Sequence, residues 1–400
     1  MGVRRHLGQD RDVAADAQVP NRNSPPVKLF ETIRPASDGD FLKPSMVRRL
    51  LLVLSLVLPG LAGCTSIGPA TVSRDRLDYA AALADASKRE TLLNIVKLRY
   101  ADAPSLVTVS QLVAGYTLEG RVDLRSDFFR NTWNFSDDLA FGIGGTFSDR
   151  PTATYTPIRG DDFARLMLTP IPPSELFAML ATGGPAALTL GLAVQSINGL
   201  RNWSPDTRGI ERVDAAFLEV LQLLGELRDD GILGFRFEAE DGRRIAYLLL
   251  EDPDDQPRDA RVVRLLELLD LDMGMTDFPI RFGFGGGDAD EIMIYTRSLL
   301  EILDNLAAQI EVPGADVAAG RTYPTQTSPA EAPLLPDLSV QSRTIRPLNS
   351  FVAVEYRGTW YWIDDRNYYA KRVFSVLLLL LNLVDKSGSV QLPVITIPTG

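Results

Sequence analysis

The sequence predicts an α+β fold: a mixed sheet with packed helices, followed by a small C-terminal unit of β-hairpin, helix and strand. Segments with helical periodicity recur along the chain, and the clearest are 75–100, 213–227, 258–271, 297–310 and 366–384. Short β-branched and aromatic runs lie between them, often in pairs around a turn dipeptide such as Asp241-Gly242 or Arg357-Gly358. Paired strands between helices favour a mixed sheet over a strictly alternating parallel one.

The first 63 residues have the features of a leader. Residues 1–45 are polar and contain scattered prolines without a helical or strand period, which predicts a disordered extension or a stretch upstream of the true start. Residues 46–63 begin with basic Arg48 and Arg49 and continue into the apolar run from Leu50 to Leu58, as a lipoprotein signal peptide does. We therefore expect translation to begin at Met46.

The end of this apolar run carries a processing motif. Leu61-Ala62-Gly63-Cys64 resembles the lipobox of bacterial lipoproteins. The resemblance implies cleavage between Gly63 and Cys64, with acyl chains on Cys64 holding the protein to a membrane. Thr65 stands where an Asp would retain an enteric-type lipoprotein in the inner membrane. We expect a lipid anchor in the outer membrane of a Gram-negative bacterium, on its periplasmic face.

The rest of the chain divides by composition into four parts. Residues 64–74 are predicted to be the tether that follows the anchor, and residues 75–311 the main α+β domain. Residues 312–337 are rich in proline and alanine and predict a linker. Residues 338–400 are predicted to form the C-terminal unit, ending in a strand at 390–397.

Within the main domain, the elements are expected in this order. After the helix at 75–100 come a strand at 105–118, aromatic strand-like segments at 121–158 and two short helices at 161–168 and 174–181. A buried strand at 188–197 follows, and then the helix at 213–227, a hairpin at 234–250, the helix at 258–271, strands at 278–284 and 291–295 and the helix at 297–310.

Residues 139–158 show strand periodicity of a particular kind. Apolar residues alternate with small ones from Leu139 to Phe147, and the alternation resumes from Thr152 to Thr156 after a polar turn. Strands of transmembrane barrels have this pattern over about 9–11 residues. One interpretation is a β-hairpin that each copy gives to an oligomeric barrel, in an export-pore protomer resembling the curli-type channels. The other is a hairpin with one face on a core.

A candidate recognition loop follows the apolar run at 188–197. Gln195, Asn198, Arg201 and Trp203 combine amides with an Arg and a Trp, which are favoured at the centres of protein interfaces. The alternative is a turn whose amides satisfy backbone groups. The first interpretation predicts protein partners in the cell envelope.

The composition excludes several kinds of chemistry. His6 and Cys64 are the only His and Cys in the chain, which removes Ser-His-Asp triads, Cys nucleophiles, His-ligated metals and disulfides. The net charge of −11 argues against a nucleic-acid partner. The glycine-rich run Gly283–Asp288 lacks the last glycine of a dinucleotide fingerprint and predicts a hairpin turn, so no cofactor or metal is expected. A carboxylate-dependent hydrolase using the acidic clusters at 251–255, 288–291 and 364–365 is the remaining enzymatic alternative.

Two further segments, 91–100 and 150–157, are similar to a group of uncharacterised proteobacterial envelope lipoproteins. The resemblance implies an envelope location and supplies no catalytic residue. The expected function is therefore a structural or accessory component of an envelope complex, with the export-pore protomer and the hydrolase as alternatives.

Overall fold

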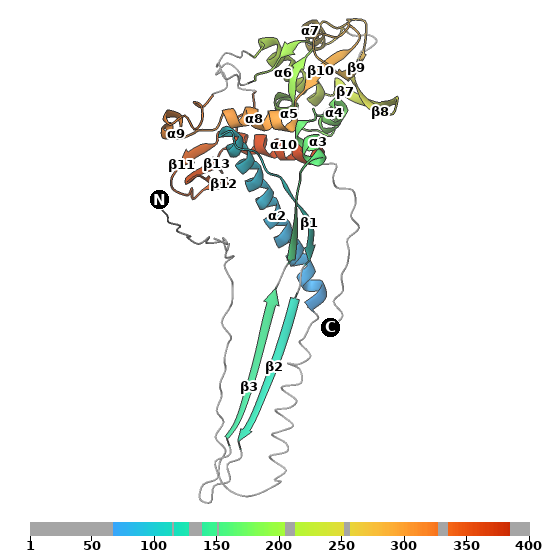
Figure 1. Cartoon of the computed structure of the whole chain (residues 1–400). Coiled ribbons are helices and arrows are strands. Elements are labelled where there is room, and N and C mark those ends of the chain that lie inside the picture. Colours follow the sequence, from blue (N-terminus) through green and yellow to red (C-terminus); the bar gives the residue numbers. More distant parts are fainter. Residues whose placement is uncertain are drawn as a thin grey trace, which may run out of the picture. The chain divides into compact units, whose positions relative to one another are not determined.

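The computed structural model in Figure 1 describes residues 67–113, 116–127, 138–149, 152–204, 213–251, 257–326 and 335–384. Within these residues it contains nine helices and mixed sheets, which confirms the predicted α+β class. The chain divides into two compact units, residues 1–65 with 109–155 and residues 66–108 with 156–400. We call the second unit the body. The leader, Gly63, Cys64 and the expected strand at 390–397 lie outside the described residues.

The helices confirm most of the periodic segments. They are α2 (Ile67–Arg99), α3 (Asp161–Leu168), α4 (Pro173–Ala181), α5 (Ala186–Ala193), α6 (Ala215–Asp229), α7 (Ala260–Leu269), α8 (Leu299–Ala308), α9 (Gly314–Ala318) and α10 (Tyr368–Val384). The start of α8 shows the local physics: the Ser298 side chain accepts from the backbone N–H of Glu301, whose carboxylate accepts from the Ser298 N–H. Among the described helices, none combines the length and apolar composition that a bilayer crossing requires.

A six-stranded mixed sheet forms the centre of the body, in the order β6-β5-β10-β9-β8-β7. Its strands are β5 (Val194–Ile197), β6 (Leu200–Arg201), β7 (Leu233–Glu240), β8 (Arg243–Leu250), β9 (Asp277–Phe282) and β10 (Ile292–Thr296). Helix α4 packs against β7, β8 and β9. Buried and less buried residues alternate along β8, where Ala246, Leu248 and Leu250 are buried, as expected for a strand with one face on a core.

The glycine-rich segment after β9 is not a hairpin turn, because β9 and β10 run parallel, with Ile292 opposite Ile280. The loop between them therefore has to run back along the sheet, so that β10 starts at the same end as β9. A Cβ on Gly283 or Gly287 would overlap the side chain of Met293, so the glycines allow the loop to cross that residue closely. The prediction of a hairpin was wrong because glycine content indicates a tight path and not a strand direction.

The C-terminal residues share the core of the body. Strands β11 (Gln341–Arg343), β12 (Ser350–Tyr356) and β13 (Thr359–Asp364) form a sheet in the order β11-β13-β12, and β12 packs against α2. Core residues of this sheet and of α10 belong to the same buried cluster as those of the six-stranded sheet. The predicted separation of a 338–400 unit is therefore not seen in the described residues, because the α2 helix supplies the apolar surface that covers both parts.

Two other segments differ from expectation. Part of the predicted linker is folded, since Pro313 precedes helix α9 and Leu335 is buried. The expected strand at 188–197 is helix α5 followed by strand β5. Almost every residue of α5 is buried, and a short, uniformly apolar run does not distinguish helix from strand. The predicted tether at 64–74 also overlaps helix α2, which starts at Ile67.

Candidate functional site

The most unusual structure in the chain is a two-stranded ribbon. It comprises β1 (Val107–Val113) paired with β4 (Thr152–Pro157), and β2 (Tyr116–Asp127) paired with β3 (Asp138–Asp149). Figure 1 shows β2 and β3 side by side, and they pair antiparallel along their whole length, from Tyr116 opposite Asp149 to Asp127 opposite Asp138. The register has no bulge over this stretch.

This register sorts the residues of β2 and β3 into two rows, because directly opposed residues of an antiparallel pair share a face. The apolar row consists mainly of apolar and glycine pairs, with a polar residue in the pair at each end: Tyr116–Asp149, Leu118–Phe147, Gly120–Gly145, Val122–Ile143, Leu124–Phe141 and Ser126–Leu139. The polar row sets charged residues of β2 mainly against small residues of β3, and ends in a pair of acidic residues: Thr117–Ser148, Glu119–Thr146, Arg121–Gly144, Asp123–Gly142, Arg125–Ala140 and Asp127–Asp138.

The structure corrects the predicted hairpin at 139–158. Its two halves, β3 and β4, do not pair with each other: β3 pairs with β2, and β4 pairs with β1. The alternation along residues 139–147 indicated strand structure and two distinct faces, but periodicity does not determine which strand lies opposite. The charged row became visible only with the pairing, because its charges are on β2.

Helix α2 holds the chain where it enters the ribbon. Asn94 is only 1% exposed, and its Nδ2 donates to the Ser105 carbonyl while its Oδ1 accepts from the Ser105 N–H, both at 2.9 Å. One turn earlier, Glu90 Oε1 accepts from the Val107 N–H at 2.7 Å. Desolvation raises the pKa of Glu90, against the opposing effect of this hydrogen bond. The start of β1 is therefore fixed by a helix that the core buries.

The two ends of the ribbon are also tied to each other. The Ile158 N–H donates to the Leu106 carbonyl at 3.0 Å, and Thr108 Oγ1 donates to the Thr156 carbonyl at 3.2 Å. These bonds continue the pairing of β1 and β4 into the segments that follow α2 and precede α3.

The predicted recognition loop has a structural role. Asn198 and Gly199 form the turn between β5 and β6, with φ of 44° and 81°, as a tight two-residue hairpin requires. The Asn198 side chain donates to the Leu269 carbonyl and accepts from the Met293 N–H, both at 2.7 Å. Its amide joins three segments of the body and is not free to recognise a partner.

The other residues of that loop differ in how far they are buried. Trp203 is 8% exposed, and the exposed Arg201 lies 3.7 Å from the Asp214 carboxylate. Gln195 is partly buried in β5. The alternative interpretation, a turn whose amides satisfy backbone groups, describes Asn198 correctly. The composition of the loop could not reveal this, because the partners of these groups are distant in sequence.

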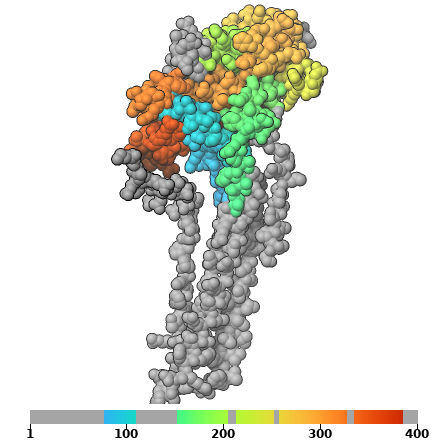
Figure 2. All heavy atoms as spheres, viewed as in Figure 1, coloured from blue at the N-terminus to red at the C-terminus, as the bar shows by residue number. Residues whose placement is uncertain are grey.

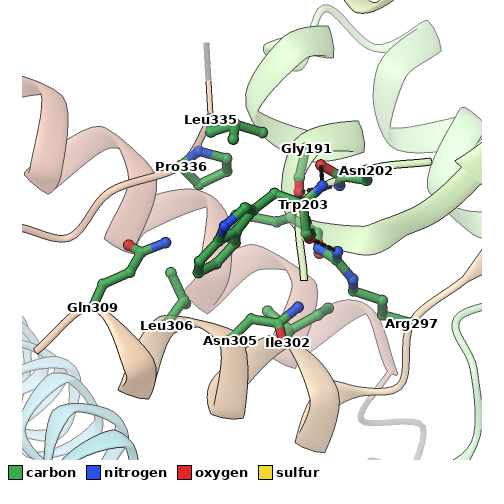
Figure 3. Close-up of a pocket in the computed structure, with 11 residues that line it drawn as sticks. Gly191, Asn202, Trp203, Arg297, Ile302, Asn305, Leu306, Gln309, Leu335 and Pro336 are labelled. Carbon is green, nitrogen blue, oxygen red and sulfur yellow. Dashed lines mark hydrogen bonds between the residues drawn. The ribbon is translucent and has the colours of Figure 1, made fainter. Parts of the chain in front are cut away.

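Trp203 lines a small pocket, shown in Figure 3 between its indole ring, Leu335, Pro336 and helix α8. The enclosed space of about 10 Å³ is that of a single water molecule. Arg297 is buried beside it, donates to the Gly191 carbonyl at 3.3 Å and also donates to the Trp203 carbonyl. The Arg side chain therefore anchors the backbone around Trp203, and the space is too small for a substrate.

Several carboxylates of the acidic clusters form ion pairs. Asp364 pairs with Arg366 at 3.0 Å, and hydrogen bonds from that residue lower the pKa of Asp364 to about 2. Asp365 pairs with Lys371, and Glu291 with Arg281. Among the residues that the structure describes, no group of three or more His, Cys, Asp or Glu could hold a metal ion. Most of the 251–255 cluster lies outside those residues.

A buried polar cluster at the end of α2 was not predicted. The Tyr100 hydroxyl lies 2.7 Å from Asp316 Oδ2 and 2.6 Å from the Tyr361 hydroxyl. The hydrogen bond from Tyr100, and secondarily that from Arg321, lowers the pKa of Asp316. The cluster joins α2, α9 and β13. Tyr100 is more than 200 residues from both Asp316 and Tyr361 in the sequence, and no local signal connects them.

Arg99 lies next to this cluster and is 1% exposed. It donates to the Tyr323 carbonyl at 2.6 Å, and its guanidinium stacks 3.8 Å from the centre of the Tyr323 ring. Its Nε and Nη1 have no hydrogen-bond partner among the described residues, and burial lowers its pKa. Thr322 Oγ1 donates to the Arg99 carbonyl at the end of α2. These contacts hold the segment after α9 against the helix.

Comparison with known proteins assigns no relative. The chain matches no family model, no curated protein and no solved structure. Any function must therefore be argued from the ribbon and the surfaces of the body.

Proposed function

We propose that the protein is a lipid-anchored protomer of an oligomeric envelope pore, in which the ribbons of several copies pair edge to edge as the pore wall. One observation carries this proposal. The register of β2 and β3 gives a ribbon of full length with an apolar row and a charged row. An amphipathic strand pair of this kind suits a wall with lipid on one side and water on the other.

The length of the ribbon is sufficient for a bilayer. Twelve residues in each of β2 and β3, at about 3.3 Å per residue, extend roughly 40 Å. A strand that crosses the hydrocarbon core needs about 9–11 residues when it is tilted by about 45°. The ten residues that join the two strands include Phe128, Phe129, Trp133 and Phe135, and aromatic residues are favoured at membrane interfaces.

Unpaired strand edges require that several ribbons combine. Each strand of a two-stranded sheet uses one edge for pairing, and the other edge presents backbone N–H and C=O groups. In hydrocarbon each unpaired group costs several kcal/mol, so a single ribbon is not a stable membrane structure. A closed ring of ribbons pairs every edge. The polar row, with Glu119, Arg121, Asp123 and Arg125, would then face the aqueous lumen with charges of both signs.

The leader supports the location. The lipobox-like Leu61-Ala62-Gly63-Cys64 predicts acyl chains on Cys64, and Thr65 favours the outer membrane with the body on the periplasmic side. Cys64→Ala is expected to abolish labelling by radioactive palmitate and to leave uncleaved precursor. Unchanged labelling in that variant would exclude the anchor without bearing on the ribbon.

We prefer this proposal to the accessory component expected from the sequence. That expectation drew on the lipid tether and on the 195–203 loop, and the Asn198 and Trp203 groups of that loop are engaged inside the body. The envelope partner in the present proposal is a further copy of the same chain.

A cysteine scan tests the two rows directly. Cys64 is the only cysteine in the chain, and lipidation blocks its thiol, so an introduced cysteine provides the only free thiol. Val122→Cys and Ile143→Cys sample the apolar row, and Asp123→Cys and Gly142→Cys are their immediate neighbours in the polar row. The full-length lipidated protein is reconstituted into liposomes and treated with a charged thiosulfonate reagent.

The expected result is an alternation with a period of two. The polar-row cysteines react rapidly and their modification reduces the conductance, whereas the apolar-row cysteines react slowly and leave the conductance unchanged. Equal reaction rates in the two rows, or liposomes without conductance at any protein density, would overturn the proposal.

A further inference from the structure

Two arginines cover the outer face of the C-terminal sheet. The Arg343 guanidinium lies 4.8 Å from the Trp362 ring centre, and that of Arg346 lies 5.2 Å from the Trp360 ring centre. Ile345 and Leu348 are exposed in the same connection between β11 and β12, Leu348 to 96%. We call these six residues the Arg–Trp face. Figure 2 shows the C-terminal part of the chain, in red, exposed on this side of the molecule.

The arginines of this face differ from most arginines of the body. Arg261, Arg264 and Arg281 each form ion pairs with carboxylates. Arg343 and Arg346 stack on tryptophans and make no ion pair or hydrogen bond with the described residues. Their stacked guanidinium groups are held in place while their N–H donors remain available, which favours binding of a carboxylate.

A surface of complementary chemistry lies on the loop after β9. Phe284 is 81% exposed, and its ring packs edge-on against Tyr295. Asp288 and Asp290 follow in the same loop, are exposed and form no ion pair with the described residues. We call Phe282, Phe284, Asp288 and Asp290 the Phe–Asp loop. It combines exposed aromatic rings with carboxylates, as the Arg–Trp face combines exposed aliphatic groups with guanidinium groups.

The distribution of charge along the chain supports the same pairing. Residues 338–384 contain six Lys and Arg against three Asp and Glu, although the whole chain has a net charge of −11. Residues 156–337 contain 15 Lys and Arg against 31 Asp and Glu. Two copies of the basic sheet would repel each other, whereas the basic sheet of one copy attracts the acidic region of another. A contact between unlike surfaces is therefore favoured over a symmetric one.

We infer that the Arg–Trp face of one copy binds the Phe–Asp loop of the next copy, and that this contact repeats around a ring. The inference rests on the proposed function, since it names the contact through which the bodies assemble. Within the body, β9 and β10 lie at the opposite end from β11, β12 and β13 (Figure 1). A contact between opposite ends is head-to-tail, and head-to-tail contacts generate rings when the rotation closes.

Paired cysteines test this contact. The double variant Leu348→Cys/Phe284→Cys, made in the full-length lipidated protein and oxidised in the membrane, is expected to give a ladder of disulfide-linked multimers. Each single variant alone is expected to give no ladder and no dimer. The matched control Leu348→Cys/Leu168→Cys places the second thiol on an exposed residue of α3 and is expected to give no ladder.

Charge reversal tests the same contact by a second route. Arg343→Asp/Arg346→Asp is expected to reduce the oligomer to monomers on a sizing column with mass detection. Asp288→Arg/Asp290→Arg should do the same. In a mixture of the two variants both contacts between unlike copies are again complementary in charge, so the copies can alternate and oligomers should form. Monomers in the mixture, or oligomers in the single reversals, would overturn the inference.

Other occupants give different results. Dimers of Leu348→Cys alone would indicate a symmetric contact, and loss of binding to anionic phosphatidylglycerol vesicles without loss of oligomers in Arg343→Asp/Arg346→Asp would indicate a lipid surface. Either outcome overturns the inference. The cysteine scan of the two rows reports on the ribbon and not on the contact between bodies. Alternating reactivity without a disulfide ladder would therefore overturn the inference and leave the proposed pore standing. A ladder without row alternation would contradict the proposed pore.

Discussion

The six-stranded sheet and the ribbon differ in how many of their strand edges have paired backbone N–H and C=O groups. In the sheet, β5, β10, β9 and β8 each pair on both edges, and α4 covers part of one face. In the ribbon, β2 and β3 pair only with each other within the described part of the chain. Within the described residues only the outer strands of the sheet, β6 and β7, have an unpaired edge, whereas both strands of the ribbon have one and the ribbon also carries the apolar row. One copy of the chain therefore pairs most strand edges of the sheet, whereas in the proposed pore the outer edges of the ribbon are paired by further copies.

The side chains on the second face of the sheet reinforce the contrast. Arg236 pairs with Asp277 at 3.1 Å, and Arg281 with Glu240 at 3.4 Å, so opposite charges from β7 and β9, the two strands that flank β8, meet on that face. Exposed pairs of this kind add little stability but keep the face compatible with water. In the ribbon, most charges lie in one row of β2, and the other row is apolar except near its ends, at Ser126 and Asp149.

The largest expected effect concerns the apolar row. Ile143→Lys is expected to abolish conductance in planar bilayers, because a Lys at the bilayer midplane costs about 2–4 kcal/mol in each copy. Thr146→Lys, in the polar row of the same strand, is the matched control and should retain conductance. Circular dichroism melting of the body should be the same in both variants. Equal loss of conductance in the two variants would remove the distinction between the rows.

The next largest effect concerns the core of the sheet. Phe278 in β9 is fully buried, and Phe278→Ala is expected to lower the free energy of unfolding by about 3–5 kcal/mol. Phe284→Ala is the control, because its exposed ring should contribute less than about 0.5 kcal/mol to a monomer. Urea denaturation followed by tryptophan fluorescence measures both. A similar cost for the two variants would contradict the assignment of Phe278 to the core.

A smaller effect is expected where α2 holds the segment that leads into β1. Asn94→Ala removes the two hydrogen bonds between the buried Asn94 amide and the Ser105 backbone, each of which contributes about 0.5–1.5 kcal/mol. Amide exchange at Ser105 should accelerate more than exchange in β8. Asn382→Ala removes an exposed amide that bonds only to the Leu378 carbonyl of its own helix, and should change neither. Unaltered exchange at Ser105 would mean that Asn94 does not hold this segment.

The smallest effect concerns acid stability. The Tyr100 hydrogen bond lowers the folded-state pKa of Asp316, so the stabilisation is present above the ordinary Asp pKa and is lost as the pH falls through the folded pKa. Tyr100→Phe is expected to lower stability by about 1 kcal/mol at neutral pH and to flatten its decline below pH 4 or so. Tyr368→Phe, at an exposed Tyr, is the control. Thermal melts between neutral pH and pH 3 measure the difference, and parallel acid limbs for Tyr100→Phe and the unaltered protein would contradict it.

Local patterns predicted the elements that local physics controls. The helix at 297–310 has its own capping box, and the hairpins over Asp241-Gly242 and Arg357-Gly358 have the left-handed backbone that their turn residues accept. The run at 188–193 was assigned to a strand, because an apolar residue in a buried helix and one in a buried strand give the same composition. The site was predicted only in part: the alternation of residues 139–147 was recognised, and its partner strand was not.

The sequence by itself determined the α+β class, the positions of the long helices, the exclusion of His and Cys chemistry and the expectation of a lipid anchor at Cys64. These depend on periodicity, turn residues and composition, which act over a few positions. Only the tertiary structure decided that β3 pairs with β2, that β9 and β10 run parallel, and that Asn198 and Trp203 serve the body. The physical reason is that strand partners, buried hydrogen bonds and the two rows of the ribbon each depend on residues brought together from distant parts of the chain.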